Sequence, residues 1–327
     1  MKREEYKHLK RLLPREIALP YFEDRESAWL LSQLMPETIP VAAARRAHWG
    51  KLLDRPSLRR LMARCGGELR HSDVRALANA DQTLDAVGYG PAGAAAIEVA
   101  YAKPWQDFRL TFALWGEHER SWDQTSRQQR NLVIQLGFPS DHATLMGRYL
   151  KSGDRKRFEW DGHPIRTQGC PTLAWARVDL DLRRGEALIE EVQSDWLRYA
   201  DDELDELRHA KPRSRELAQL ERYKAGLVTQ YDRIWPRAML LATLVILRDW
   251  LHVERVWMHR PETGVVLKRI AGTAPPRSLY SSLPKSFCFA PTRDRPQMLR
   301  SLPAKVTKRL PKDGPVFWMM EFDEGSR

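Results

Sequence analysis

Residues 172–193 alternate between apolar and polar side chains, and this alternation restricts the fold more than any other feature of the chain. One face of the first half carries Ala174, Ala176, Val178, Leu180 and Leu182, and the other carries Arg177, Asp179 and Asp181. A two-residue period is typical of a β-strand, because successive side chains point to opposite faces. A turn at 183–186 and a return strand ending at Gln193 then predict an antiparallel hairpin.

The segments around this hairpin predict a protein in which helices and strands are mixed. Short apolar runs at 108–115 and 131–137 are candidate strands, and a helix at 239–250 leads through a short link into a strand at 253–258. The apolar run 315–322 is expected to add an edge strand. A helix that is followed at once by a strand favours helices packed on a sheet, so we predict an α+β fold with a mixed sheet.

The chain divides by pattern into a helical N-terminal region and a larger α/β domain. Helical spacing and capping residues run through residues 1–90, and the clear strand signals lie in residues 91–327. Within that domain we expect a helical insertion at 197–235 and a Pro-rich, basic segment at 285–314.

The composition predicts a soluble protein with a packed core. Apolar residues make up 43% of the 327 residues, and twelve residues are Trp, which buries a large area. The three cysteines, Cys65, Cys170 and Cys288, form no closely spaced pair, which favours a reducing compartment. The longest apolar run, 238–247, is about half of the ~20 residues that a membrane-spanning helix needs. We therefore expect a cytoplasmic protein without a membrane partner.

The formal net charge of +11 predicts attraction to polyanions, chiefly through phosphate contacts. The basic segment near the C-terminus concentrates this charge, and the residues expected to contact nucleic acid are Arg300, Lys305, Lys308 and Arg309. Two alternatives stay open. The segment is only a solvated loop, or the net charge reflects an Arg-rich composition without a nucleic-acid role.

The return strand of the hairpin ends in a cluster of acids and amides. Residues 190–196 read Glu-Glu-Val-Gln-Ser-Asp-Trp, and ligand sites of α/β sheets usually form at strand ends. Strand alternation places on one face Glu191, Gln193 and Asp195. Glu190 is expected to point inward, where burial would raise its pKa and suit it to acid–base chemistry. The structural alternative is that Ser194 or Asp195 caps the following helix.

A second polar cluster follows the predicted strand at 253–258. His259 can act as a base or as a polar clamp, with Glu262 as the residue that orients it. The structural alternative is that Thr263 caps the next helix.

Two other kinds of chemistry fit the sequence poorly. Metal binding is not expected, because His163 and Cys170 have no second pair of ligands at a suitable spacing. A nucleophilic triad assembled from Ser194, His259 and Asp195 would lack the glycines that flank the nucleophile of such enzymes.

The motif Glu-Val-Gln-Ser-Asp-Trp at 191–196 resembles the signature of modules in large polyvalent proteins of phages and conjugative elements. The parts around it are similar too: 173–177 resembles the strand before the signature, 238–264 the helix and strand after it, and 280–284 a later Tyr-to-Leu-Pro element. The resemblance covers about residues 160–322 and departs at Leu197, where those modules commonly carry His. It implies a mobile-element or phage-conflict setting rather than a particular reaction.

The order of elements also resembles the N-acetyltransferase superfamily. There a strand leads to a helix, a second strand, a short helix and a Tyr that protonates the leaving thiolate, which is the role that the resemblance implies for Tyr280. That superfamily holds pyrophosphate on a Gly-rich turn after the first strand, whereas 193–196 contains no glycine and is followed by an acidic segment. Carboxylates would repel pyrophosphate, so we expect this fold without acyl-CoA binding.

These patterns predict one pocket between the strands that end at Gln193 and Met258. The expected site residues are Glu191, Gln193, Asp195, His259, Glu262 and Tyr280. The leading hypothesis is an enzyme, or a binder derived from one, that acts on a nucleotide or a nucleic-acid-linked substrate; no cofactor is identified. The alternatives are a non-catalytic protein that binds nucleic acid or a protein partner from the same locus, and an acyltransferase that uses acyl-CoA.

Overall fold

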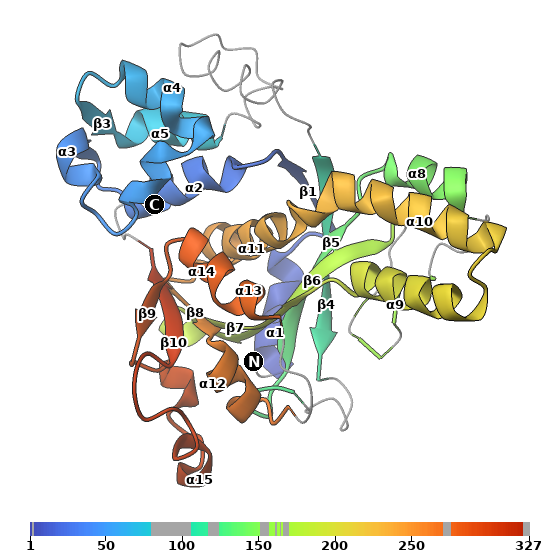
Figure 1. Ribbon diagram of the computed structural model, residues 1–327. Helices are drawn as coiled ribbons and strands as arrows, with labels where there is room; N and C mark the ends of the chain where they lie inside the picture. Colours follow the sequence, from blue (N-terminus) through green and yellow to red (C-terminus); the bar gives the residue numbers. More distant parts are fainter. Residues whose placement is uncertain are drawn as a thin grey trace.

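An eight-stranded sheet runs through the centre of the protein (Figure 1). The computed structural model describes residues 1, 3–79, 106–116, 124–150, 157–160, 162–163, 165, 170–270 and 276–322. In the order in which they lie side by side, the strands are β1 (Glu16–Tyr21), β4 (Gln106–Trp115), β5 (Asn131–Gly137), β6 (Thr172–Asp181), β7 (Glu186–Gln193), β8 (Arg255–His259), β10 (Phe317–Glu321) and β9 (Ala290–Thr292). These neighbours pair antiparallel except β7 and β8, which are parallel. The mixed sheet confirms the predicted α+β class.

The predicted hairpin is the pair β6 and β7, joined by a short turn, η4 (Leu182–Arg184), and by Gly185 in the left-handed region (φ 60°). All ten residues of β6 are buried, so the hairpin is covered on both faces. Arg177 and Asp179, on the polar face of the pattern, therefore lie in the interior and need partners there.

Helix α11 (Trp235–Val245) packs on β5, β6 and β7 and continues into a π-helical turn, η6 (Ile246–Trp250). Pro236 lies in its first turn, where the missing N–H costs nothing. This helix contains most of the long apolar run, and it is buried against the sheet. None of the described helices has the combination of length and hydrophobicity that a bilayer crossing demands.

The predicted helical N-terminal region, 1–90, contributes strands as well as helices. β1 alternates and buries Leu19 and Tyr21, so it pairs with β4 and becomes one edge of the central sheet. Two short strands, β2 (Thr38–Pro40) and β3 (Glu68–Arg70), pair with each other. The helical elements are α1 (Arg3–Leu12), α2 (Arg25–Leu34), α3 (Val41–Ala44), η1 (Gly50–Asp54), α4 (Pro56–Arg64) and α5 (His71–Ala78). Residues 80–90 lie outside the described part.

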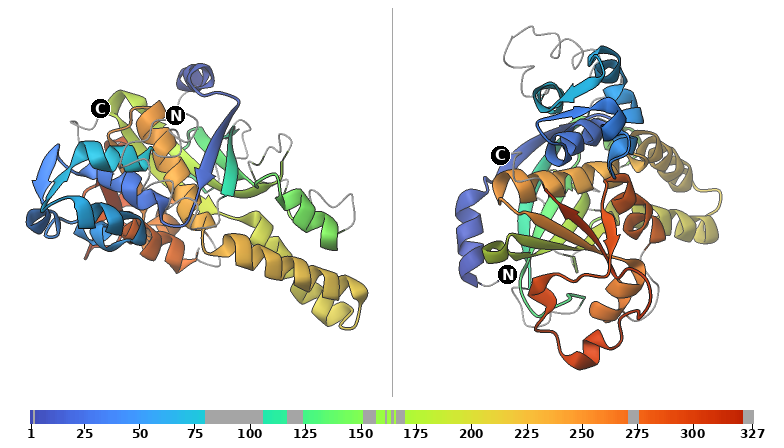
Figure 2. Two further views of the ribbon diagram at one scale, coloured as in Figure 1. Left: turned by 90° about the horizontal axis from the view of Figure 1, so that it is seen from above. Right: turned by 90° about the vertical axis from the view of Figure 1, so that its left-hand side faces the viewer.

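The helical insertion after β7 consists of α9 (Asp195–Ala210), α10 (Arg215–Leu227) and a π-helical turn, η5 (Val228–Asp232). α9 and α10 pack side by side and project beyond the sheet, next to the short α8 (His142–Tyr149) (Figure 2). The insertion starts at Asp195, two residues before the predicted position, because Ser194 is the N-cap: its Oγ accepts the backbone N–H of Leu197 at 3.3 Å. Ser214 caps α10 in the same way.

The C-terminal part wraps the far edge of the sheet with short elements (Figure 1). They are α12 (Pro261–Leu267), α13 (Arg277–Tyr280), α14 (Ser282–Ser286), η7 (Gln297–Leu299) and α15 (Ala304–Thr307). β10 is not the predicted edge strand, because the three-residue strand β9 pairs with its outer side. Thr263 is not a helix cap either: its hydroxyl donates to the carbonyl of Val316 at 2.5 Å, and α12 begins with Pro261.

The packing of α11 on the sheet gives a direct test of the fold. Leu240 in α11 is 0% exposed, and we expect Leu240→Ala to lower the free energy of unfolding by about 2–5 kcal/mol through lost burial and a cavity. Val228 is 45% exposed, so the control Val228→Ala should change it by less than about 1 kcal/mol. Urea unfolding of both variants measures the difference, and equal midpoints would contradict this packing.

Candidate functional site

The parallel pair of β7 and β8 brings Glu190 next to His259. Their register ends with Ile189 opposite Met258, one residue before both side chains. On its other side β7 has a bulge: Ile189 pairs with Val178 and Glu191 with Arg177, so Glu190 is the extra residue. The bulge interrupts strand alternation at the motif, and it leaves the Glu190 side chain fully buried.

Glu190 is held as an ionised carboxylate by three donors. The backbone N–H of Ser126 donates to Oε1 at 3.0 Å, and the Ser126 hydroxyl donates to Oε2 at 2.9 Å. Nε2 of His259 lies 2.9 Å from Oε2. Burial alone would raise the pKa of Glu190, but the His259 hydrogen bond and the nearby charges of His259, Arg177 and Lys268 lower it to about 2. The expectation of a raised pKa is therefore wrong, because this buried acid is fully paired.

His259 does not form a nucleophilic triad with Ser126 and Glu190. A carboxylate without a proton only accepts hydrogen bonds. Nε2 of His259 is therefore protonated and donates its N–H to Glu190. Ser126 Oγ lies 3.0 Å from that same nitrogen, whereas a triad needs the hydroxyl and the carboxylate on opposite nitrogens of the ring. Nδ1 is buried without a partner among the described residues. The three side chains thus form a closed hydrogen-bonded set.

A second layer of charges covers this set. Arg177 donates from Nη2 to Glu191 at 2.7 Å and to the carbonyl of Gln124 at 2.6 Å. Lys268, only 2% exposed, donates to the carbonyl of Glu190 at 2.9 Å and lies 3.9 Å from the Glu191 carboxylate. Burial lowers the pKa of Lys268, against the opposing effect of Glu191. We call these six residues the Glu190 network: Ser126, Arg177, Glu190, Glu191, His259 and Lys268.

Tyr280 lies against the Glu190 network and lines neither of the two described pockets. Its hydroxyl accepts the backbone N–H of Val192 at 3.4 Å, and the Lys268 ammonium lies 5.8 Å from its ring. The side chain is 2% exposed, and burial raises the pKa of its hydroxyl. Tyr280 therefore fills the space between β7 and the C-terminal helices.

A pocket of about 480 Å³ adjoins the Glu190 network through Ser126 and Lys268, which are members of both. Its walls are 124–128, 267–270, 301–303 and Val306. Three basic residues and no acidic residue line it: Arg127, Lys268 and Arg269. Arg127 is paired with Asp179, whereas Arg269 is exposed and has no ion pair among the described residues. We call this cavity the Lys268 pocket.

Backbone strain gathers at the same pocket. Gln124 (φ 66°) and Arg269 (φ 54°) are two of the five described non-glycine residues in the left-handed region. Both line the Lys268 pocket. Side chains other than glycine or asparagine are costly in this conformation, and such residues cluster at ligand sites. This agreement between strain and cavity marks the pocket as a candidate site.

Asp195 and Gln193 contact each other, and they lie in a different group of side chains from His259. Asp195 accepts hydrogen bonds from His163 Nδ1 (2.7 Å), Trp175 Nε1 (2.8 Å), Gln193 Nε2 (2.5 Å) and Arg198 Nη2 (2.9 Å). No described contact joins it to His259, so the expected single pocket divides into two groups. The triad of Ser194, His259 and Asp195, which the sequence disfavours, is not assembled, because Ser194 donates to the carbonyl of Leu173 and caps α9.

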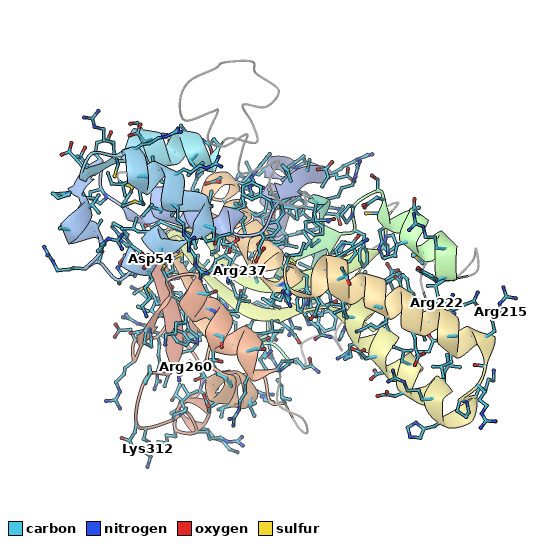
Figure 3. All side chains as sticks on the ribbon, turned by 45° about the horizontal axis from the view of Figure 1, so that its top comes forward. Asp54, Arg215, Arg222, Arg237, Arg260 and Lys312 are labelled. Carbon is cyan, nitrogen blue, oxygen red and sulfur yellow. The ribbon has the colours of Figure 1, made fainter. Side chains whose placement is uncertain are left out.

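The remaining predicted residues lie on the surface. Glu262, which was expected to orient His259, is exposed and makes no described contact with it. Glu190 is the acid that contacts His259 instead. Four predicted nucleic-acid-binding residues are all exposed: Arg300, Lys305, Lys308 and Arg309. They are close in sequence to the pocket-lining residues 301–303 and Val306, and Figure 3 shows Lys312, a little further along the chain, pointing outward.

The described residues contain no group of three or more potential metal ligands, so they offer no evident metal site. The sequence reasoning missed Ser126, Lys268 and Arg177 as site residues. Lys268 had no usable signal, because a lysine beside apolar residues usually buries its stem and keeps its ammonium in water. Ser126 had none, because a loop residue 64 positions from its partner shows no pattern.

The carboxylate of Glu190 should stabilise the folded protein at neutral pH. Its folded pKa of about 2 lies below the ordinary 4.5, so its contribution is fully present above pH 4.5 and is lost as the pH falls toward 2. At ~1.4 kcal/mol for each pKa unit, this contribution is roughly 3 kcal/mol. Glu190→Gln should remove it, because the amide NH₂ would face two other donors.

Urea unfolding between pH 7 and pH 2.5 checks this expectation. Glu190→Gln should be destabilised at pH 7 and should depend less on pH below 4.5 than the unsubstituted protein. Glu262→Gln, at an exposed acid, is the matched control and should follow the unsubstituted protein. Identical acid profiles for all three proteins would show that Glu190 is not an ionised, paired carboxylate.

Comparison with protein-family models, with curated proteins and with solved structures finds no match to this chain. The contacts and cavities described above are therefore the basis for assigning a function.

Proposed function

We propose that the protein binds a phosphate-bearing ligand, a nucleotide or a nucleic-acid-linked group, in the Lys268 pocket. The observation that carries the proposal is the charge of the lining, which has three basic residues and no acid. Arg269 presents a cation without an ion pair among the described residues, and Lys268 lies at the inner wall beside Ser126. A concave site whose charged lining is entirely cationic suits phosphate oxygens.

The rim of the pocket supports a ligand longer than one phosphate group. Residues 301–303 and Val306 form one wall, and Arg300 and Lys305, which adjoin these residues in sequence, are exposed. The phosphates of a nucleotide or of a nucleic-acid strand that lies over this wall would contact these cations, which is the main source of affinity for nucleic acid. Lys308 and Arg309 extend the same basic surface.

Lys268 gives the pocket a group capable of proton transfer. Its ammonium is buried and its pKa is lowered, which brings a lysine closer to the range of a general base. The Glu190 network holds its Nζ through the carbonyl of Glu190 and the nearby carboxylate of Glu191. An enzyme, or a binder derived from one, is compatible with this arrangement. The mobile-element or phage-conflict setting stays a prediction, because it depends on the resemblance alone.

An acyl-CoA-dependent transferase is the weaker candidate. The order β7, α9 to α11, β8, α12 and α13 fits the N-acetyltransferase-like arrangement that we retain as a proposal. However, the turn after β7 carries the buried Asp195, whose pKa is lowered, where pyrophosphate would be expected. Tyr280, the implied acid, is buried on the Val192 backbone instead of facing a described pocket. Both observations weigh against CoA.

Salt-dependent binding of a fluorescein-labelled single-stranded oligonucleotide tests the pocket. Arg269→Gly should weaken binding and lower the slope of log Kd against log salt by about 1, because one phosphate contact is lost. Glycine also relieves the left-handed conformation, so the free energy of unfolding should stay within ~1 kcal/mol. Arg300→Ala with Lys305→Ala should lower the slope further. Arg64→Ala, an exposed arginine on α4, is the control; an equal loss there would refute a localised site.

Thermal unfolding with coenzyme A separates the two candidates. We expect ADP to raise the midpoint of the unsubstituted protein and to raise it less for Arg269→Gly, since bound ligand stabilises the folded state. If coenzyme A raises the unfolding midpoint no more than ADP does, the result supports the phosphate-pocket proposal. Stabilisation by coenzyme A that survives Arg269→Gly but is lost in Tyr280→Phe would favour the transferase.

A further inference from the structure

The carboxylate of Asp195 fixes the orientation of a second histidine, His163. Four donors converge on Asp195, and its side chain is 1% exposed. Burial alone would raise its pKa, but the hydrogen bonds of His163 and Trp175 and the charge of Arg198 lower it. An ionised carboxylate only accepts, so the ring proton of His163 lies on Nδ1, 2.7 Å from Asp195. Nε2 therefore points away from the carboxylate, on the opposite side of the ring.

Nε2 of His163 is available to a ligand. This nitrogen has no hydrogen-bond partner among the described residues. It is also not one of the described polar atoms that are buried without a partner. The His163 side chain keeps 12% of its surface exposed. A carboxylate that holds one imidazole nitrogen and leaves the other open is the arrangement in which histidine binds or exchanges protons with a ligand.

An exposed tryptophan lies directly beside this imidazole. Trp160 is 46% exposed, the largest exposed fraction among the described large apolar side chains. The centroids of its ring and of the His163 ring are 4.2 Å apart, and the two ring planes make an angle of 76°. Tyr199 on α9 lies 6.4 Å from Trp160, and the Arg198 guanidinium stacks 4.9 Å above Tyr199. A flat aromatic face of this size in contact with solvent is an unused stacking surface.

We propose that Trp160 and His163 form a binding site for a nucleobase, outside the Lys268 pocket. The exposed indole face supplies stacking for a planar ring, and Nε2 supplies one acceptor for an N–H of its edge. Aromatic stacking tolerates every base, whereas the single acceptor favours bases that present an N–H beside the stacked ring. The chemistry of the site therefore fits a base from a nucleotide or an unpaired strand, and it does not depend on the proposed function of the pocket.

The surface beyond Trp160 continues toward cations that can hold the phosphate. Tyr199 and Glu203 lie four residues apart on one face of α9, and they contact Trp160 and Arg157, respectively. Arg157 in turn lines a cavity of about 860 Å³ with Arg148 and Arg215. Arg157 is neutralised by Glu203 and Glu216, but Arg148 and Arg215 are exposed, and Figure 3 shows Arg215 at the outer end of α10.

The neighbouring acids limit the electrostatic attraction of this surface. Asp201 is paired with Lys224 and Asp205 with Arg208, but Asp202 and Glu206 of α9 are exposed. Stacking and the His163 hydrogen bond should therefore dominate, and binding should depend less on salt than binding at the Lys268 pocket.

Titration of uridine, UMP and oligo(dT) into ¹⁵N-histidine-labelled protein tests the proposal. We expect the Nε2 resonance of His163 to shift on binding while Nδ1 keeps its proton. Trp160→Ala should weaken this response about tenfold or more, since it removes the stacking surface. His163→Phe keeps an aromatic ring but removes the acceptor, and should weaken oligonucleotide binding in an anisotropy assay. Trp250→Ala, at a tryptophan 36% exposed elsewhere, should stay within about twofold.

The arms of the titration distinguish the sources of the base. A response to uridine equal to that of UMP assigns the site to the base alone, and a stronger response to UMP adds the Arg148 and Arg215 surface. An unshifted Nε2 resonance with all three ligands would overturn the proposal, as would an unchanged response in Trp160→Ala. Arg269→Gly should leave the His163 shift intact, so failure here is separable from failure at the Lys268 pocket.

Discussion

Burial of both faces of the β6–β7 hairpin is the constraint on which the rest of the structure depends. Polar side chains on the second face are buried or only slightly exposed, and an unpaired charge there would cost several kcal/mol. Each of these charges therefore pairs with a residue from another element: Asp179 with Arg127, Arg177 with Glu191, and Glu190 with His259. These pairs connect the loop at 124–130 and the strand β8 to the hairpin.

The sequence predicted those parts of the fold that depend on local pattern. The hairpin, the strands at β4 and β5 and the cap at Ser194 all follow from residues within a few positions. β1 was missed, since its six residues follow a helix and pair with a strand more than eighty positions away. β9 was missed because three residues carry no period.

The candidate site was only partly accessible to the same reasoning, for a physical reason. Alternation indicated that Glu190 points inward, and that much is correct. Gln193 contacts Asp195, but Glu191 pairs with Arg177. The strand ends at Gln193 before Asp195 begins α9, so the predicted common face of Glu191, Gln193 and Asp195 does not form one site. Which base neutralises a buried acid is decided by tertiary packing, and the histidine beside Asp195 is His163 rather than the expected His259.

The parallel pairing of β7 and β8 has a consequence for the accuracy of folding. The three side chains of the closed hydrogen-bonded set are 64, 69 and 133 positions apart, so they meet only after the loops that separate them have closed. A slip of β8 by one residue would turn His259 to the opposite face of the sheet and leave Glu190 charged and alone in the interior. The carboxylate thus penalises every register but the native one, and the identity of a single buried acid helps to decide how the two halves of the sheet are joined.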